Sequence, residues 1–520
     1  MSNLFDKLFD VASSADSLDK FLNENMQLIN DFYNSNYSCI RLSKNSIENF
    51  VLLKYNVIEQ LDYTKSYVKS FVSMLLDYCE RFNFLSATPR VYTILVQNDI
   101  LINSRLQAAL EFLYPKPETN TELVDRFDSI CEKLQLAIDT EEDNDEKAIA
   151  TFLNYYGIIV NDTRLEFAKQ VRSKIVFAIQ NKTYNFFQNE NISIIADIEL
   201  HDLDLAYLEI QKVLDNVLSK KELSVYDFDL EKEKIETCED SIIETDTDYS
   251  KEIFLVPTDF DSIRSISVGH ADGRSITKRG VKILESEEEL FEYMKRFGNM
   301  HKAKLQSALE EHFPQKFSLK VNIIDWGCGQ GIASMIFLEK YGYEIVKHIT
   351  LIEPSEIAIG RAALHCKKYC NEITVKTICK KLDDLKVDDF HMPKCDITLH
   401  LFSNILDIDD YSQSHVIELI EKSCIAHNYF VCVSPYIDDI KTERLESFKR
   451  HFEKNYDSFK LLQDVANSKN NDFWCCNNTY TKGDIKHGHY FNCNEYTEDG
   501  CNNRWTRIIK VFEVNLIDNE

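Results

Sequence analysis

Glycine and proline are scarce in this sequence, with 13 and 8 among 520 residues. A chain so poor in both does not contain long flexible linkers or low-complexity tracts. No apolar run approaches the length of a membrane span, and the first residues lack a basic region followed by an apolar core. We therefore expect neither a membrane segment nor a secretory leader.

Basic residues are also in deficit, because 59 Lys and Arg stand against 86 Asp and Glu, for a formal net charge of −27. Such a surface repels nucleic acid on average, which makes general strand binding an unfavoured function although a local basic groove stays open. The 15 cysteines are scattered without the regular spacing of a disulfide framework. We therefore expect thiols in a reducing cytosol and a cytoplasmic protein.

The length of the chain predicts two or three domains rather than one, and 44% apolar residues are enough to build their cores. We expect a helical domain over 1–225, an acidic linker over 226–252 and an α/β domain over 253–520. The linker is predicted from a crowd of acidic residues whose mutual repulsion keeps the segment solvated. They are Asp227, Asp229, Glu231, Glu233, Glu236, Glu239, Asp240, Glu244, Asp246 and Asp248.

Apolar residues recur at three- and four-residue steps through most of the first domain, which predicts helices. The predicted helices span 17–32, 46–80, 90–113, 121–138, 164–187 and 202–218. No residues in this region have catalytic spacing. We expect a helical assembly that packs on the rest of the chain or binds a protein partner.

The region after Val321 alternates between apolar runs and segments of helical spacing, the pattern of a parallel sheet covered by helices. The predicted strands are 321–325, 349–353, 373–379, 396–402, 429–434 and 507–514, with a weaker one at 459–462. The predicted helices are 331–341, 355–370, 412–426 and 440–454. Upstream, we expect short strands at 253–256 and 263–268, then a helix from Ser286 that Gly298 interrupts.

The most informative segment runs from Val321 to Gly331, where a buried strand leads into a loop with three glycines. Asp325 stands at the end of the strand, and a bare backbone lets a ligand approach the amino end of the following helix. The next strand also ends in an acid, Glu353, whose carboxylate can accept both hydroxyls of a ribose. This order of elements predicts a nucleotide-type pocket at the carboxyl end of the first strand.

The run from Asp325 to Gly331 resembles motif I of the class I S-adenosylmethionine (SAM)-dependent methyltransferases: a hydrophobic strand, Asp, one residue, then Gly-x-Gly-x-Gly. Glu353 falls where that family keeps its ribose-binding acid. The resemblance implies a Rossmann-like α/β methyltransferase domain with a seven-stranded, mostly parallel sheet, preceded here by an all-α N-terminal domain that it does not cover. It also implies SAM as the cofactor, an antiparallel last strand at 507–514 and helices over 286–312 that cover the cofactor.

By this resemblance, Asp325 binds the methionine amino group and Glu353 binds the ribose. A helix cap is the alternative role for Asp325, and an exposed strand-end acid is the alternative for Glu353. The residues expected to bind the cofactor are Asp325, Gly327, Cys328, Gly329, Gly331, Glu353, Pro354, Leu382 and Asp383. The last two stand where family members often read adenine, although simple turn acids are about as common there.

Ser403 and Asn404 directly follow the fourth strand, where motif IV of the family faces the methyl group, so we expect them at the catalytic centre. Asp407, further along, is either a base or a structural residue of the loop. The loop lacks the Asn/Asp-Pro-Pro-Tyr/Phe tetrad used on adenine amino groups and the cysteine used on cytosine C5. The acceptor therefore stays open among a protein, a small molecule and RNA.

Two further groups have competing interpretations. His301 and Lys304 lie one helical turn apart and could meet the donor carboxylate, but a solvated helix face is favoured. The cysteines and histidines between 475 and 501 could bind zinc, but their irregular spacing favours thiols, and we expect no metal.

Two other functions compete with methyl transfer. The first is a non-catalytic scaffold that binds SAM, or nothing, while its helical half recruits a partner; the intact Asp325, glycines and Glu353 argue against a dead site. The second is a nicotinamide-dependent oxidoreductase. The dinucleotide fingerprint needs a glycine where Ile332 stands, which argues against that function.

Overall fold

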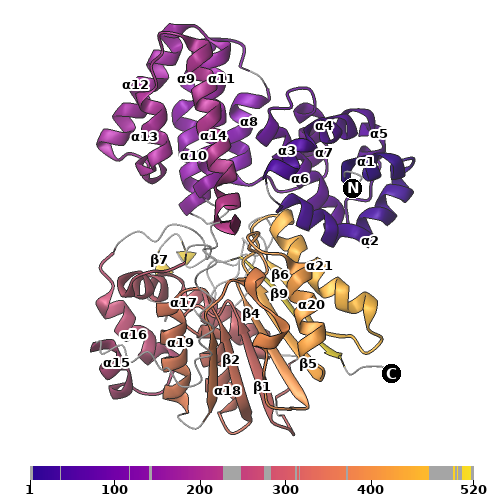
Figure 1. Ribbon diagram of the computed structural model, residues 1–520, viewed down its shortest axis with the longest axis vertical. Helices are drawn as coiled ribbons and strands as arrows, with labels where there is room; N and C mark the ends of the chain where they lie inside the picture. The colour runs from indigo at the N-terminus through magenta and orange to yellow at the C-terminus, as the bar shows by residue number, and fades with distance from the viewer. Residues whose placement is uncertain are drawn as a thin grey trace. The chain divides into compact units, whose positions relative to one another are not determined.

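The computed structural model describes residues 4–35, 37–115, 117–139, 143, 145–226, 248–273, 283–310, 313–315, 317–370, 373–467, 496–497, 500–501 and 506–516. These residues form two compact units (Figure 1). The helical unit contains the described residues up to Tyr226 together with Asp438–Glu443, and the sheet unit contains the others. Most of the predicted linker 226–252 and most of the segment 475–501 lie outside the described residues.

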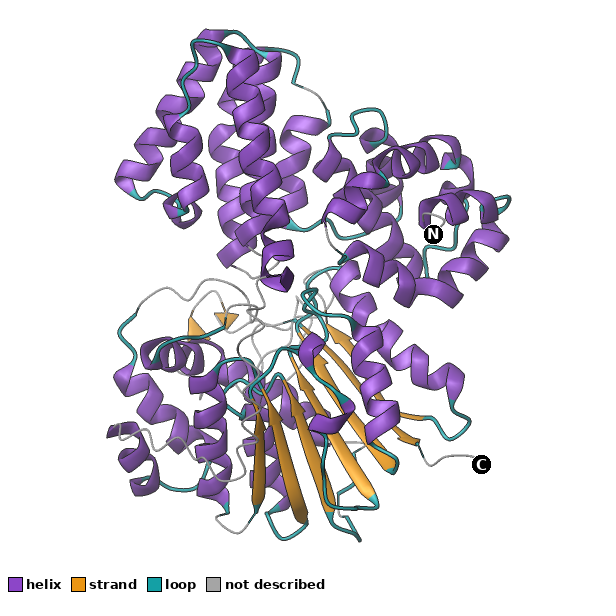
Figure 2. Cartoon of the chain, in the orientation of Figure 1, coloured by secondary structure: helices purple, strands orange, loops and turns teal. Residues whose placement is uncertain are grey.

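The helical unit contains only helices among its described regular elements (Figure 2). They are α1 (Leu4–Val11), α2 (Ala15–Tyr33), α3 (Tyr37–Leu42), α4 (Lys44–Leu53), α5 (Tyr55–Glu59), α6 (Ser66–Phe82), α7 (Thr88–Gln97), α8 (Ser104–Leu113), α9 (Asn120–Asp125), α10 (Phe127–Asp139), α11 (Asp145–Asp162), α12 (Leu165–Asn181), the 3₁₀ turn η1 (Asn185–Gln188), α13 (Glu190–Asp197) and α14 (Leu203–Tyr226). The all-α character predicted for this part of the chain is confirmed. Helices α1, α3, α11 and α13 were not predicted.

The single helix predicted over 46–80 is wrong, because the chain forms α4, α5 and α6 there. Lys54, with φ −106° and ψ 12°, leaves helical geometry between α4 and α5. The turn before α6 is fixed by Asp62, whose carboxylate accepts from the backbone N–H of Thr64 at 3.1 Å. Apolar spacing continues across both breaks because all three helices bury one face in the same core.

Two more predicted helices are shorter than expected for the same kind of reason. The range 90–113 is divided into α7 and α8, and α8 begins where the Asn103 side chain accepts from the N–H of Leu106 at 2.9 Å. The range 164–187 ends as an α-helix at Lys182, whose φ of 50° is left-handed.

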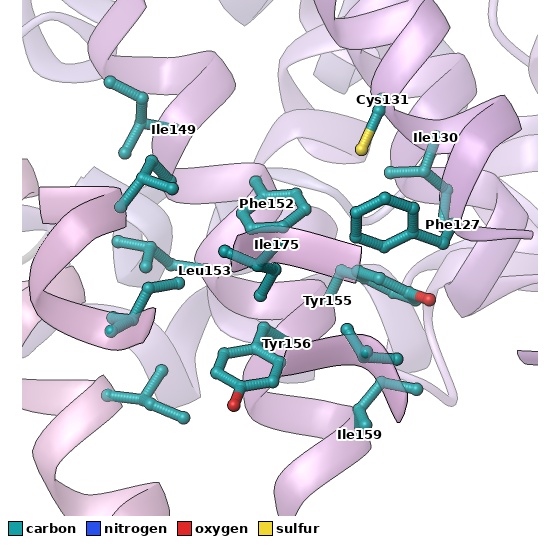
Figure 3. Close-up of a cluster of buried hydrophobic side chains, with 14 of the residues drawn as sticks. Phe127, Ile130, Cys131, Ile149, Phe152, Leu153, Tyr155, Tyr156, Ile159 and Ile175 are labelled. Carbon is teal, nitrogen blue, oxygen red and sulfur yellow. The ribbon is translucent and has the colours of Figure 1, made fainter. Parts of the chain in front are cut away.

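Two hydrophobic cores share helix α8. In the core drawn in Figure 3, aromatic side chains of α10 and α11 pack together, and the ring of Phe152 lies 5.0 Å from that of Phe187 at an angle of 68°. Helix α8 contributes Phe112 to this core and Leu106 to the core of α1–α7. The two cores are therefore held by one helix that belongs to both.

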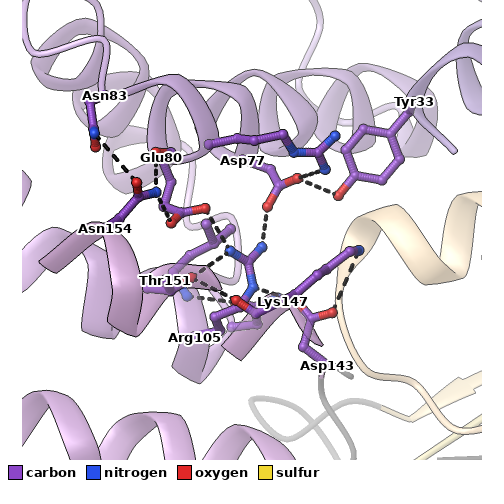
Figure 4. A network of polar contacts seen from close by, with 12 residues as sticks. Tyr33, Asp77, Glu80, Asn83, Arg105, Asp143, Lys147, Thr151 and Asn154 are labelled. Atoms are coloured by element: carbon purple, nitrogen blue, oxygen red, sulfur yellow. Dashed lines mark hydrogen bonds and ion pairs between the residues drawn. The ribbon is translucent and has the colours of Figure 1, made fainter. Parts of the chain in front are cut away.

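A buried ion network surrounds Arg105 on the same helix (Figure 4). The guanidinium is 2% exposed; Nε donates to Asp143 at 2.7 Å, Nη1 donates to Glu80 at 3.0 Å, and Nη2 donates to Asp77. The remaining oxygens of the three carboxylates have partners from Arg81, Tyr33, Lys147 and Asn154. Three buried negative charges are thus compensated by Arg105, Arg81 and Lys147, as buried ions require.

The sheet unit contains a seven-stranded sheet in the order β3-β2-β1-β4-β5-β9-β6, in which β9 runs opposite to the other six strands. The strands are β1 (Val321–Trp326), β2 (Val346–Ile352), β3 (Thr374–Ile378), β4 (Ile397–Ser403), β5 (His427–Ser434), β6 (Lys460–Asn467) and β9 (Arg507–Asn515). The Rossmann-like fold class is confirmed, including the antiparallel final strand. The weak strand at 459–462 is the start of the longer β6.

Helices cover the sheet, and their order along the chain alternates with the strands. They are α17 (Glu287–Glu310), α18 (Ile332–Tyr341), α19 (Glu356–Tyr369), α20 (Gln413–Ser423) and α21 (Asp439–Asn455), whose first residues count with the helical unit. Alternate residues of β1 point to opposite faces. Ile323 enters the core with α17 and α18, whereas Trp326 stacks on Phe402 at 5.5 Å and 5° on the other face.

The short strands predicted at 253–256 and 263–268 are wrong: the first is the 3₁₀ turn η2 (Ile253–Leu255), and the second lies in α16 (Phe260–His270). Asp259 decides the local structure, since its side chain caps α16 by accepting from the N–H of Ser262 at 2.8 Å. The apolar residues there are then buried at helical spacing.

The interruption predicted at Gly298 is also wrong, because α17 runs through it. A side chain at this position would lie 3.1 Å from the sulfur of Met294 and 3.2 Å from Cδ of Arg264 on α16. The glycine therefore permits the close packing of α16 on α17 rather than breaking the helix. Among the residues that the structure describes, no helix is both long and apolar enough to span a bilayer.

We expect Arg105→Met to lower the free energy of unfolding by about 3–5 kcal/mol, because it leaves buried carboxylates without their cation. Urea denaturation of the full chain followed by far-UV circular dichroism measures this. Arg41→Met is the control, since the Arg41–Asp215 pair is exposed and such pairs contribute less than about 1 kcal/mol. Equal losses in the two variants would contradict a stabilising role for the network.

Candidate functional site

The turn between β1 and α18 is built from backbone that only glycine adopts easily. Gly327, Gly329 and Gly331 have φ values of 60°, 51° and 76°, all left-handed. The turn closes through the N–H of Gly331, which donates to the carbonyl of Cys328 at 2.7 Å, and Cys328 N–H donates to Ile352 of β2 at 2.9 Å. The loop is thus tied to both itself and the neighbouring strand.

The three glycines differ in what a side chain would meet. A Cβ at Gly327 would lie 2.7 Å from Cδ1 of Ile405, and one at Gly331 would lie 3.0 Å from Cβ of Ala362. A Cβ at Gly329 would have no atom within 4 Å. Gly327 and Gly331 are therefore required by packing, whereas Gly329 faces open space that a ligand can use.

Asp325 is buried below this loop, with 1% of its surface exposed. Its Oδ2 caps α18, accepting from the backbone N–H of Ser334 at 3.2 Å and from the Ser334 hydroxyl at 2.7 Å. Its Oδ1 has no hydrogen-bond partner. Burial raises the pKa of Asp325 to about 7, against the Ser334 hydrogen bonds and with the help of Glu353. The cap predicted as an alternative is present, but it uses only one of the two oxygens.

Glu353 follows β2, and its carboxylate contacts the same glycine loop. Its Oε2 accepts from the N–H of Gly329 at 3.1 Å, and its Oε1 accepts from the N–H of Ser355 at 3.0 Å. Burial raises the pKa of Glu353, while these backbone hydrogen bonds oppose the shift. The carboxylate is therefore not a free strand-end acid: it is fixed against the glycine loop, at the carboxyl ends of β1 and β2.

The remaining predicted cofactor residues lie at the carboxyl ends of the neighbouring strands. Leu382 is buried in the 3₁₀ turn η3 (Leu382–Asp384) after β3. Asp383 accepts from the N–H of Ser412, the residue before α20, at 2.9 Å. Pro354 is half-buried directly after Glu353. Contact of these residues with a cofactor stays a prediction.

The end of β4 carries Ser403 and Asn404. Asn404 has a left-handed φ of 56°, and its backbone N–H donates to the carbonyl of Val433 at 2.7 Å. Its side-chain amide donates to Nδ1 of His301 at 2.5 Å and accepts from Nζ of Lys304 at 3.4 Å. Strained backbone of this kind at a strand end is common where a side chain must be aimed at a ligand.

The solvated face favoured for His301 and Lys304 is wrong, because the two side chains are 5% and 0% exposed. Burial, together with the charge of Lys304, lowers the pKa of His301 to about 3, so the ring is neutral. The one-turn spacing of His301 and Lys304 indicated that the two side chains share one face of α17. The sequence did not indicate that this face is the buried one.

Asp407, in the loop after β4, accepts from the hydroxyl of Ser434 at 2.8 Å, which ties this loop to the end of β5. Sequence reasoning missed Ser334, Gln330 and His365, which hold the glycine loop and have no motif of their own. In the described part of the chain, no three His, Cys, Asp or Glu side chains come together as metal ligands.

A scan against known protein families and a search of curated proteins both find no match. Solved structures do match, at low identity. The plantazolicin methyltransferase BpumL with SAH is 14% identical over 51% of this chain and 97% of that chain, with a TM-score of 0.24. A precorrin-6y C5,15-methyltransferase from Geobacter metallireducens is 13% identical over 41% and 86%, with a TM-score of 0.23.

A protein from Listeria monocytogenes proposed to be a class I SAM-dependent methyltransferase is 10% identical over 77% of this chain and 89% of that chain, with a TM-score of 0.28. These matches carry no residue roles to this chain. The fold class rests on the strand order and on the antiparallel β9.

We expect Asp325→Asn to stabilise the ligand-free protein by about 2–3 kcal/mol more at pH 8 than at pH 5. The pKa of Asp325 is raised in the folded state to about 7. Between the ordinary pKa of an Asp, about 3.9, and this raised value, the folded state binds a proton that the unfolded state has released. The free energy of unfolding therefore falls as the pH rises through this range. Urea unfolding at both pH values measures the difference; an equal effect of the substitution at the two pH values would contradict it.

Proposed function

We propose that this protein is a SAM-dependent methyltransferase. One observation carries the proposal: the buried Asp325 and the half-buried Glu353 stand at the ends of adjacent parallel strands around a glycine loop with an open face. Asp325 has one oxygen without a partner, and a buried carboxylate in that state is matched by a cationic ligand. A sulfonium compound that also carries an ammonium group and a ribose supplies the charge and hydroxyls that this arrangement accepts.

The residues fit SAM in a definite order. Asp325 would hold the ammonium group through its unpartnered oxygen, while Glu353 would accept the ribose hydroxyls, keeping its hydrogen bond from Gly329. Leu382 and Asp383 would meet the adenine. When bound, SAM supplies an electrophilic methyl group, and methyl transfer of this kind depends on positioning more than on a covalent intermediate.

Asn404, with Ser403 beside it, would form the acceptor side of the site. His301 and Lys304 hold the Asn404 amide from both ends, so its direction is set before any acceptor arrives. Because the ring of His301 is neutral, Lys304 is the cation of this pair. We propose that this group orients the acceptor, which is a protein, a small molecule or RNA.

We further propose that the helical unit brings a protein partner or acceptor to the enzyme. Its described elements are helices around two hydrophobic cores and a buried ion network, and we propose recognition as its role. A scaffold that binds SAM without turnover is the outcome that labelled-methyl transfer would reveal.

Calorimetric titration with SAM tests the proposal, with NAD as competitor and tritiated methyl transfer to fractionated cell extract as the second step. We expect Gly329→Val to weaken SAM binding by about 100-fold or more, because the side chain fills the open space. Gly273→Val is the matched control, since Gly273 also has a positive φ and open surroundings. Tight SAM binding by the Gly329 variant, or displacement of SAM by NAD, would refute the site.

We expect Glu353→Ala to weaken SAM binding by about ten- to a hundredfold, because it leaves the ribose hydroxyls unpaired. Glu353→Gln should lose less, since its amide oxygen still accepts from Gly329. The control is Glu356→Ala, an exposed acid in the first turn of α19. Unchanged affinity in a folded Glu353→Ala protein would remove Glu353 from the site.

A further inference from the structure

The glycine loop makes contacts with α17 and α19 on the side opposite its open face. Gln330 lies between Gly329 and Gly331 and is 1% exposed. Its side-chain Nε2 donates to the carbonyl of Leu290 in α17 at 2.9 Å, and its own backbone carbonyl accepts from His365 Nδ1 at 2.7 Å. The loop is therefore anchored to α17 and to α19 at one residue.

The protonation of His365 follows from its partners. A carbonyl can only accept, so Nδ1 carries the hydrogen. Burial lowers the pKa of His365 to about 3, which leaves Nε2 as a lone pair. That lone pair accepts from the hydroxyl of Tyr249, 2.7 Å away. Tyr249, His365 and the Gln330 carbonyl thus form a chain in which each hydrogen bond has one possible direction.

Tyr249 belongs to α15 (Asp248–Glu252) and is 2% exposed. Its ring lies 4.2 Å from the guanidinium carbon of Arg361, one turn before His365 on α19, and 5.5 Å from the ring of Phe291. Arg361 is itself fixed by Glu287 at 3.5 Å. The hydroxyl of Tyr249 is therefore aimed by packing on its ring, independently of the hydrogen bond it makes.

These contacts fix one peptide plane of the loop. The carbonyl of Gln330 and the N–H of Gly331 belong to the same planar unit. His365 holds the carbonyl, and the carbonyl of Cys328 accepts from the N–H at 2.7 Å. Rotation of this plane would move Gly329, whose N–H is held by Glu353.

We propose that Tyr249 and His365 are positioning residues for the cofactor loop, and that α15 is thereby a working part of the SAM site. The identity of the cofactor rests on the proposed function, whereas the hold of Tyr249 and His365 on the loop does not. Neither side chain touches the open face of the loop. Their effect on a ligand passes through the orientation of the Gln330–Gly331 peptide.

Tyr249→Phe removes only the hydroxyl and keeps the ring against Arg361. We expect amide hydrogen exchange in residues 327–331 to become about three- to tenfold faster, and the Kd for SAM to rise by a similar factor, as the loss of one buried hydrogen bond predicts. Tyr456→Phe is the control. Its hydroxyl donates to Glu421 at 2.9 Å in the same unit but away from the loop, so it should change neither measurement.

Two substitutions of His365 separate positioning from general stability. His365→Leu has similar size and no donor, and should weaken SAM binding by about ten- to a hundredfold. His365→Asn places an amide N–H near the position of Nδ1 and should restore most of that loss. Equal SAM affinity in the two folded variants would overturn the role of the Nδ1–H hydrogen bond.

The loop exchange distinguishes this inference from the proposed function. Unchanged exchange in Tyr249→Phe overturns the inference whatever ligand the protein binds. Faster exchange with an unchanged Kd for SAM also overturns it, because the hold on the loop would then not reach the cofactor. If wild-type protein binds no SAM but exchange is faster in Tyr249→Phe, the methyltransferase proposal fails while the hold on the loop stands.

Discussion

The candidate site depends on one constraint of the backbone: the chain must turn from β1 into α18 within a few residues. Three of these residues take left-handed φ values, which side chains make costly. Two of the glycines are also pressed against Ile405 and Ala362. The turn places the amino end of a helix and two strand-end acids at one edge of the sheet. Any ligand of this edge must bind to the backbone of that turn.

The electrostatics of the two acids favour one class of ligand for this edge. Burial raises the pKa of both Asp325 and Glu353, and the charge of Glu353 raises the pKa of Asp325 further. Such a pair destabilises the fold at neutral pH unless positive charge arrives. A phosphate-bearing dinucleotide would bring negative charge instead. A ligand with an ammonium group and ribose hydroxyls would satisfy both acids, which is the reason we propose SAM rather than NAD.

Sequence reasoning predicted the parts of this site that depend on neighbours along the chain. A strand, an acid and closely spaced glycines are local features, so Asp325, Glu353 and the sheet were accessible from residue pattern. The burial of His301 and Lys304 was not, because it depends on how α17 crosses the sheet. Tyr249 meets His365 across 116 positions of sequence without any motif. The strand expected at 263–268 failed for another reason, since the Asp259 cap begins a helix there despite the strand-like composition.

In the helical unit, buried charged side chains compensate one another and stabilise the fold. Around Arg105, both oxygens of Asp77, Glu80 and Asp143 have partners. In the sheet unit, Asp325 is as deeply buried, yet one of its oxygens has no partner. Since burial costs both carboxylates similar hydration, the difference lies in what compensates them. Side chains of the protein compensate the first group, whereas burial raises the pKa of Asp325 to about 7, and we propose that a bound cation compensates its charge. That contrast within one chain is the reason we interpret the first group as a stabilising network and Asp325 as part of a binding site.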